Sequence, residues 1–335
     1  MINSSMINVA MRGVPSARHG ALLSTPPAVD ATQFDTVKLR LTEAVPLAHA
    51  LVAAVAASAD IATLAIKGPV LSCYGLRGTR PSADADILVA PDRLGELVEL
   101  LAAYGWRERY ERPIARILDD HSVTLTHHDW PCDVDLHWYF PGMLADPAAA
   151  FAFLWGGRST VQLAHCAVPA PRRVDAAAIA ALHALRHPES VRHRADLDDL
   201  VRRLRANWRP TDAQRLGRLI DSCGAAVTLN PFLADLGVDA AVDSIRTAQL
   251  SAWRAYTATH DHGSTGAWLY AIRRAGWRER PQLLLRAVYP TRRELIAEYG
   301  SISRRRRWAV RRRRWWRACR ALPQAIQVLR GTDRP

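Results

Sequence analysis

Two Asp-x-Asp triplets, each inside a run that predicts a buried strand, constrain the fold more than any other feature. Asp84 and Asp86 open "DADILV", and Asp133 and Asp135 occur in "CDVDLHW". Because side chains two residues apart in a strand point to the same face, each strand places two carboxylates together. Buried carboxylates are costly unless they are paired or coordinate a cation. The pattern therefore predicts a sheet with an acidic, cation-requiring site on one face.

The flanking runs predict helices and further strands. Residues 34–59 are apolar at helical spacing, and Pro46 is expected to kink or break that helix. The run "IATLAIKG" predicts a strand, residues 69–76 a short helix, and "PDRLGELVELLAAYGW" a longer one. The runs "HSVTLTHHD" and "CDVDLHWYF" predict a strand pair. This order indicates an α+β fold: a small mixed sheet with flanking helices.

Changes in composition divide the chain into four predicted parts. Residues 1–33 are expected to be a flexible N-terminal tail, and residues 34–170 the α/β core. The prolines of "PAPRR" interrupt regular structure before a mainly helical region over residues 171–300. Residues 301–335 are expected to be an Arg/Trp-rich C-terminal helix or tail.

The basic character of the chain belongs to its C-terminal end. Residues 301–335 contain 12 arginines and one aspartate, so only +2 of the net charge of +13 belongs to the other 300 residues. Trp308, Trp315 and Trp316 interrupt the arginine blocks. Such a segment suits contact with a nucleic acid or an anionic membrane surface. The alternative is a helix whose tryptophans dock on the body while its arginines face water.

Other features exclude several classes of protein. The five cysteines are scattered without a CxxC pair, which fits a cytoplasmic protein with neither a disulfide framework nor a structural zinc site. The most apolar stretch, residues 45–66, contains His49 and Asp60 and predicts a core helix entering a strand, not a transmembrane segment. The sequence has no P-loop, GxSxG elbow or GxGxxG turn, which argues against P-loop kinases, hydrolases and dinucleotide enzymes.

Several of these motifs together carry a family resemblance. The run "LAIKGPVLSCYGLRGTRPSADADILV", then His121, then "VDLHW" resembles in order and spacing the bacterial nucleotidyltransferase family often described as uncharacterised, a branch of the polymerase-β-like superfamily. The resemblance covers about residues 60–140 and implies a nucleotidyltransferase core. Pro69 is a departure, because the superfamily has Gly-Ser or Gly-Gly at this turn and proline has no N–H to offer a phosphate.

The resemblance and the chemistry of hard cations together suggest catalytic roles for three aspartates. Mg²⁺ prefers oxygen ligands, and Mn²⁺ accepts the same set. Two such ions about 4 Å apart can clamp the attacking and leaving oxygens of a phosphoryl displacement. Asp84 and Asp86 are expected to bridge the metals, and Asp135 to complete the metal nearer the acceptor and help deprotonate its hydroxyl. Asp133 shares a face with Asp135 and competes for that third role.

Five further residues match positions that the resemblance associates with nucleotide binding. They are Lys67, Gly68, Arg80, His121 and His137. Lys67 and Gly68 stand where a tight turn and a cation could receive the triphosphate of an NTP such as ATP. Arg80 could neutralise phosphate or pair with Asp84, and either histidine could be a hydrogen-bonded core residue.

The function implied is a metal-dependent nucleotidyltransferase that moves an NMP from an NTP to a hydroxyl and releases pyrophosphate. Acceptors in such families are small molecules, peptides or RNA, and the sequence does not choose among them. One alternative is a toxin-like transferase that acts on tRNA. The other is a non-catalytic protein that binds nucleic acid or membrane through its basic tail, in which Asp84 and Asp86 only form structural ion pairs with Arg77 or Arg80.

Overall fold

The structure is a computed structural model. It describes residues 38–78, 80–109, 121–187, 190–238, 275–289 and 303–332, together with single helical positions between residues 250 and 295. The expected N-terminal tail, residues 1–33, and much of the stretch from 239 to 300 lie outside the described residues. The predicted division into domains therefore stays a prediction.

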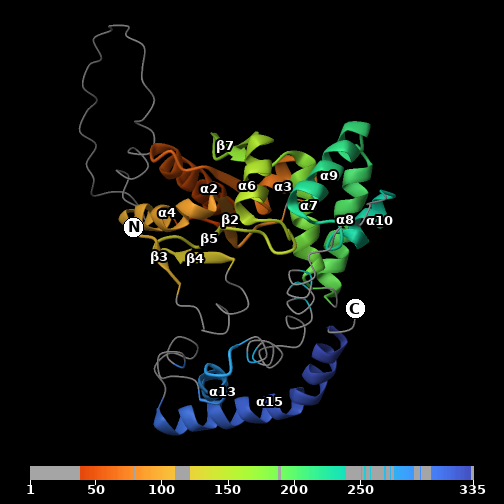
Figure 1. The fold of residues 1–335 in the computed structure, drawn as a ribbon. Coiled ribbons are helices and arrows are strands. Elements are labelled where there is room, and N and C mark those ends of the chain that lie inside the picture. The colour runs from red at the N-terminus through yellow and green to blue at the C-terminus, as the bar shows by residue number, and fades with distance from the viewer. Residues whose placement is uncertain are drawn as a thin grey trace, which may run out of the picture.

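Among the described residues, helices and strands are intermixed along the first half of the chain, and only helices follow from Arg173 on (Figure 1). The first part comprises α2 (Leu41–Ser58), β1 (Thr63–Ile66), α3 (Gly68–Cys73), β2 (Asp84–Val89), the 3-10 turn η1 (Pro91–Arg93), α4 (Leu94–Ala103), β3 (Arg107–Glu108), β4 (Ser122–Thr126), β5 (Asp133–His137), α6 (Pro147–Gly156), β6 (Ser159–Leu163) and β7 (Cys166–Ala170). The second comprises α7 (Arg173–Leu185), α8 (Val191–Arg205), α9 (Pro210–Cys223), α10 (Asn230–Leu236), α13 (Arg280–Val288) and α15 (Arg304–Thr332).

Five strands form a mixed sheet in the order β1-β2-β5-β4-β3. Strands β2 and β5 are parallel, and the remaining neighbours are antiparallel, including the pair β4 and β5. The α+β fold and the strand pair predicted by alternating hydrophobicity are both confirmed. Strands β6 and β7 form a separate two-stranded hairpin.

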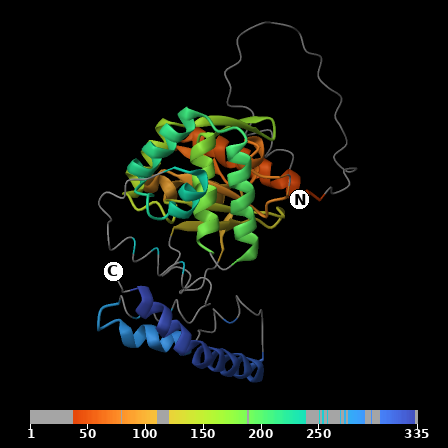
Figure 2. The same ribbon diagram turned by 90° about the vertical axis from the view of Figure 1, so that its right-hand side faces the viewer.

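The alternation along β2 decides which way its carboxylates point. Ala85, Ile87 and Val89 belong to one hydrophobic cluster, which contains buried residues of α2 and α4. Leu88 belongs to a second cluster, which contains buried residues of α7, α8 and α9. Because Asp86 shares a face with Leu88, its carboxylate lies on the side of the sheet that the later helices cover. Figure 2 shows these helices packed against the sheet.

Helix α2 runs through Pro46 without interruption, so the expected break into two helices is wrong. Proline removes only one backbone hydrogen bond, and buried side chains from Ala44 to Ala56 hold the helix in the core. Among the described helices, α2 alone has the length and apolar composition needed to cross a membrane. Its packing against β1, β2 and α4 agrees with the predicted core helix.

Candidate functional site

The register between β2 and β5 places four aspartates in two adjacent rows. Asp84 stands opposite Asp133, and Asp86 stands opposite Asp135. Because the strands are parallel and the spacing within each triplet is two, all four carboxylates lie on the same face. The sequence pattern thus predicted the convergence of these aspartates, and the strand register determines which of them are neighbours.

Asp86 is the most heavily contacted of the four. Its side chain is 6% exposed, accepts a hydrogen bond from Nε2 of His137 at 3.0 Å and forms an ion pair with Nζ of Lys67. Burial acts to raise the pKa of Asp86, but Lys67 and His137 outweigh it, so that this pKa lies well below its ordinary value. Asp86 is therefore an anion, and since it can only accept, His137 is the donor.

Asp135 lies next to Asp86 but has fewer partners. Its Oδ1 atom is buried and has no hydrogen-bond partner among the described residues. Burial and the charge of Asp86 raise the pKa of Asp135 to about 7. Ligand atoms of Asp86, Asp135 and His137 all lie within 4.8 Å of one another, close enough to reach a single cation. A metal ion would supply the positive charge and the bonding partner that these buried carboxylates lack.

Asp84 and Asp133 occupy the row nearer the start of the strands. Asp84 lines the cleft described below, and its pKa is raised by burial and by the charge of Asp86. Asp133 instead forms an ion pair with Arg109 at the edge of the sheet. The metal role of Asp84 stays a prediction, because Asp84 does not belong to the group of Asp86, Asp135 and His137 whose ligand atoms converge.

The turn between β1 and α3 carries Lys67 and Gly68 in unusual backbone conformations. Both have positive φ angles, +57° at Lys67 and +35° at Gly68. A non-glycine residue at positive φ costs about 1 to 3 kcal/mol, and such residues cluster at functional sites. A Cβ atom at position 68 would lie 2.8 Å from Oγ of Ser82, so the close approach of these two segments requires glycine.

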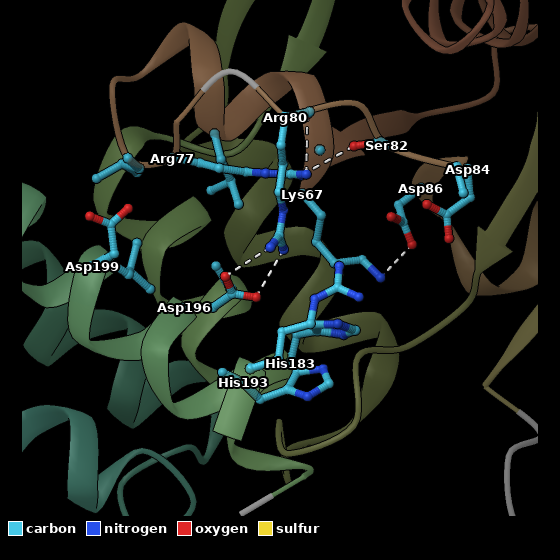
Figure 3. A pocket seen from close by; sticks show the side chains of 18 of the residues that line it. Lys67, Arg77, Arg80, Ser82, Asp84, Asp86, His183, His193, Asp196 and Asp199 are labelled. Carbon is cyan, nitrogen blue, oxygen red and sulfur yellow. Dashed lines mark hydrogen bonds and ion pairs between the residues drawn. The ribbon is translucent and has the colours of Figure 1, made fainter. Parts of the chain in front are cut away.

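A cleft of about 400 Å³ opens beside these residues, between the sheet and helices α7 and α8 (Figure 3). We use "sheet wall" for Lys67, Asp84, Asp86 and the adjacent Asp135. We use "helix wall" for His183, Arg192, His193 and Asp196. The two histidine rings of the helix wall lie 5.5 Å apart between centroids. Burial is the largest cause that lowers the pKa of His183, and Lys67 adds to it.

Arg80 connects the two walls in a way that the sequence did not indicate. Its guanidinium binds both carboxylate oxygens of Asp196 on α8, at 3.0 and 2.8 Å. The expected alternative, an ion pair between Arg80 and Asp84, is not what the structure has (Figure 3). Arg77 likewise donates to Ser82 and to backbone carbonyls of its own loop. Lys67 is the cation that reaches the aspartates instead.

His121 lies behind the site, where the sheet meets α7. Its ring stacks on His137 with centroids 5.3 Å apart, and its Nε2 accepts from Arg186 at 3.3 Å. Arg186 in turn covers the ring of Phe140. His121 therefore supports His137, which supports Asp86, and among the described residues neither histidine lines the cleft.

The helix wall is the part of the site that sequence reasoning missed. The sequence has a third Asp-x-Asp triplet, Asp196 to Asp198, whose helical pattern indicates a solvated helix face, and the sequence indicates a core or surface position for His183. Asp196 and His183 both line the cleft. The sequence signal for the helix wall was its composition, because histidine and arginine cluster around the α7 to α8 connection. No local spacing rule predicts which residues of two helices will face a distant strand.

Comparisons with known proteins find one family match. Residues 32–230 match the model of the family described as "Uncharacterised nucleotidyltransferase". No curated protein matches the chain. Solved structures similar to it include the following two. An antigenic nucleotidyltransferase-like protein from Paracoccidioides brasiliensis is 11% identical, with a TM-score of 0.35 over 60% of this chain and 93% of that one. The antibiotic-resistance factor ANT(2'')-Ia is 17% identical, with a TM-score of 0.32 over 58% of this chain and 90% of that one.

The family match covers more than half of the chain and contains both aspartate triplets, the Lys67-Gly68 turn and the helix wall. The chain belongs to the uncharacterised nucleotidyltransferase family and is a transferase of that class.

Proposed function

We propose that the protein transfers an NMP from an NTP to a hydroxyl group of an acceptor, in a reaction that depends on a divalent cation. The observation that carries this proposal is the pairing of Asp86 with Asp135 across two parallel strands, beside a cleft whose opposite side bears cations. A carboxylate pair needs positive charge, and a triphosphate needs both a metal and cationic side chains.

The donor set fits Mg²⁺ or Mn²⁺. Carboxylate oxygens are the ligands these ions prefer, and the buried Oδ1 of Asp135 has no other partner among the described residues. Asp86 and Asp135 would hold the ion, with Asp84 as the further ligand expected from the sequence. When bound, the cation would neutralise charge that develops on the transferring phosphoryl group.

The remaining chemistry falls to side chains of this chain. The acceptor oxygen forms a bond to the α-phosphorus while the bond from that phosphorus to the β-phosphate bridging oxygen breaks, and pyrophosphate leaves. Asp135, opposite Asp86 on the neighbouring strand, would accept the proton of the attacking hydroxyl. His137 holds Asp86 in place through its Nε2 hydrogen bond. Lys67, 5.8 Å from the centre of the Phe140 ring, would move from Asp86 towards phosphate oxygens.

The helix wall would receive the β- and γ-phosphates. Arg192 and His193 open α8 on the cleft side, and His183 of α7 lies beside them. Arginine suits phosphate because its planar guanidinium donates several hydrogen bonds in a fixed geometry. The triphosphate would thus span the cleft, with its α-phosphate at the sheet wall and its free end at the helix wall.

The direct test is incubation of the purified chain with each of the four α-labelled NTPs, Mg²⁺ or Mn²⁺, and a fractionated cell extract. We expect label to enter one acceptor fraction, with an equal amount of pyrophosphate released, and we expect EDTA to stop the reaction. Asp86→Asn should lose the activity. The matched control is Asp198→Asn, an exposed aspartate of α8 that does not line the cleft.

Binding provides a second readout that does not need the acceptor. A ligand that binds only the folded state raises its stability by mass action, so one NTP with Mg²⁺ should raise the melting temperature. The proposal is wrong if no NTP shifts melting with either cation and no fraction of the extract becomes labelled.

A further inference from the structure

The large apolar side chains that water can reach gather in one part of the chain. Among the described residues, those that are exposed are Trp277, Leu284, Leu285, Tyr289, Trp308, Trp315 and Trp316, with Val191 as the one outside residues 277–316. The tryptophans of α15 are 61%, 54% and 58% exposed in chain order. They are therefore not docked on the body. This contradicts the alternative prediction from the sequence, in which the tryptophans dock there. Exposed apolar groups gathered in this way mark an interaction surface.

The indoles of α15 form a stripe along one side of a long helix. An α-helix turns by about 100° per residue, so Trp308, Trp315 and Trp316 fall within a sector of about 100°, which also contains Cys319. The helix spans 29 residues, which corresponds to a length of about 44 Å. Figures 1 and 2 both show α13, which carries Leu284 and Leu285, beside this helix. We call α13, α15 and Trp277 the Arg/Trp surface.

Arginines lie on all sides of α15, and Arg305 and Arg312 fall within the sector of the indoles. Ten of the 12 arginines in residues 301–335 lie between positions 304 and 320. Arg320 covers the ring of Trp316 at 4.1 Å, and Arg278 lies 5.1 Å from the ring of Trp277. A guanidinium stacked on an indole presents charge and apolar area on the same patch. The partner of such a surface must be strongly anionic and must also accept buried apolar groups.

A nucleic acid and an anionic bilayer would both complement the positive charge of this surface, and its aliphatic residues distinguish between them. Tryptophan can stack on nucleobases, but Leu284 and Leu285, which are 51% and 62% exposed, have no π-face to offer. Leucine gains by entering the acyl region of a bilayer, while tryptophan and arginine suit its headgroup region. We propose that the Arg/Trp surface binds the interface of an anionic phospholipid bilayer, with its indoles and leucines inserted and its arginines against lipid phosphates.

The proposal is tested by sedimentation of the purified full-length chain with vesicles. One set contains phosphatidylcholine alone, and the other contains about one third phosphatidylglycerol. We expect binding at least about tenfold tighter to the anionic vesicles, and loss of that binding at high salt, because exposed charges are screened. Lipids brominated in their acyl chains should quench tryptophan fluorescence in the complex if the indoles are inserted.

Matched variants separate the two contributions. Trp308→Ala combined with Trp315→Ala and Trp316→Ala should abolish the quenching and weaken binding by tenfold or more. Arg312→Gln with Arg313→Gln should weaken binding several-fold, whereas Arg202→Gln with Arg205→Gln, exposed arginines of α8, should not. The altered side chains of α15 are exposed, so melting temperatures should stay unchanged, and the arginine pair keeps the test valid if the tryptophan variant misfolds.

Three outcomes would overturn the proposal. Equal retention by neutral and anionic vesicles would remove the role of the arginines. Binding to RNA at the same salt, with no retention by anionic vesicles, would assign the surface to nucleic acid. Self-association in gel filtration, abolished by the tryptophan variant and accompanied by no vesicle binding, would assign it to a second copy of the chain. Nucleotidyl transfer is measured separately and does not enter these readouts.

Discussion

The two walls of the cleft are built from different secondary structure and carry different charges. The sheet wall presents aspartates whose spacing is fixed by strand geometry and by the parallel register of β2 and β5. The helix wall presents mainly cationic and imidazole groups, and these meet the sheet only because α7 and α8 pack on it. A strand pair can fix carboxylates against one another, which suits chemistry at one phosphorus. Two helices offer an adaptable lining, which suits holding the substrate.

The largest expected effect separates two aspartates on the same strand. Asp135→Asn should lower the rate of nucleotidyl transfer by about 1,000-fold or more, because it removes a charge where the transition state needs it. Asp133→Asn should change the rate only a few-fold, because Asp133 pairs with Arg109 at the sheet edge. Initial rates with an α-labelled NTP provide the measurement. Equal losses in the two variants would mean that the row nearer the strand starts also takes part in catalysis.

Acid should lower the unfolding free energy of the protein through protonation of His49 in α2, on the sheet side of the molecule. Burial lowers the pKa of His49 to about 4, with the charge of Asp86 opposing it. Because an unfolded histidine titrates near 6.5, the unfolded state binds the proton more readily between these values. Stability is therefore complete above pH 6.5 and falls as the pH drops towards 4, by about 3 kcal/mol for this group.

Chemical denaturation at pH 7 and pH 4.5 measures this loss. His49→Leu should make this loss smaller by about 2 kcal/mol, and the remainder should come from buried histidines such as His137 and His183, whose pKa values burial also lowers. His128→Leu, at an exposed position, should leave the acid sensitivity of the wild type unchanged. If the His49 variant loses as much stability in acid as the wild type, then another group on the sheet side binds the proton.

The helix wall should affect binding more than the chemical step. Arg192→Gln should raise KM for the NTP about tenfold and change kcat less, since it removes a contact made both before and in the transition state. Arg194→Gln, two residues along α8 and outside the cleft lining, is the control. Steady-state kinetics distinguish the two parameters. A loss confined to kcat would place Arg192 with the catalytic residues and erase the distinction between the walls.

The sheet wall was predictable from the sequence because its rules are local. The period of two and the apolar residues after each triplet were enough to place Asp84 and Asp86 on one face, and the family resemblance added Asp135. The supporting contact between His137 and Asp86 was not predictable, because it depends on which strand lies beside β2. The helix wall depends on docking between segments about 100 residues apart, for which a single sequence has no signal.

Two errors in predicting the fold have local causes. The hairpin of β6 and β7 was missed because its turn places Ala164 and His165 at positive φ, +48° and +61°, where asparagine or glycine is the usual signal. Pro169 within β7 also argued against a strand. Pro46 was expected to kink or break the helix over residues 34–59, but α2 is not broken there, because its packing outweighs one missing hydrogen bond.

The smallest expected effect concerns the link between the walls. The bidentate pair of Arg80 and Asp196 joins the loop before β2 to α8, but its side chains are 44% and 38% exposed. Water and salt screen such pairs, so a double-mutant cycle of Arg80→Gln and Asp196→Asn should give a coupling of about 0.2 to 1 kcal/mol in unfolding free energy. The same cycle applied to KM for the NTP should show a larger coupling if the substrate needs both walls held in register. A coupling of several kcal/mol in unfolding free energy, with none in KM, would instead make this pair a structural element of the fold. The ion pair of Asp196 with Arg80 would then position the helix wall more than the apolar packing of α8 does.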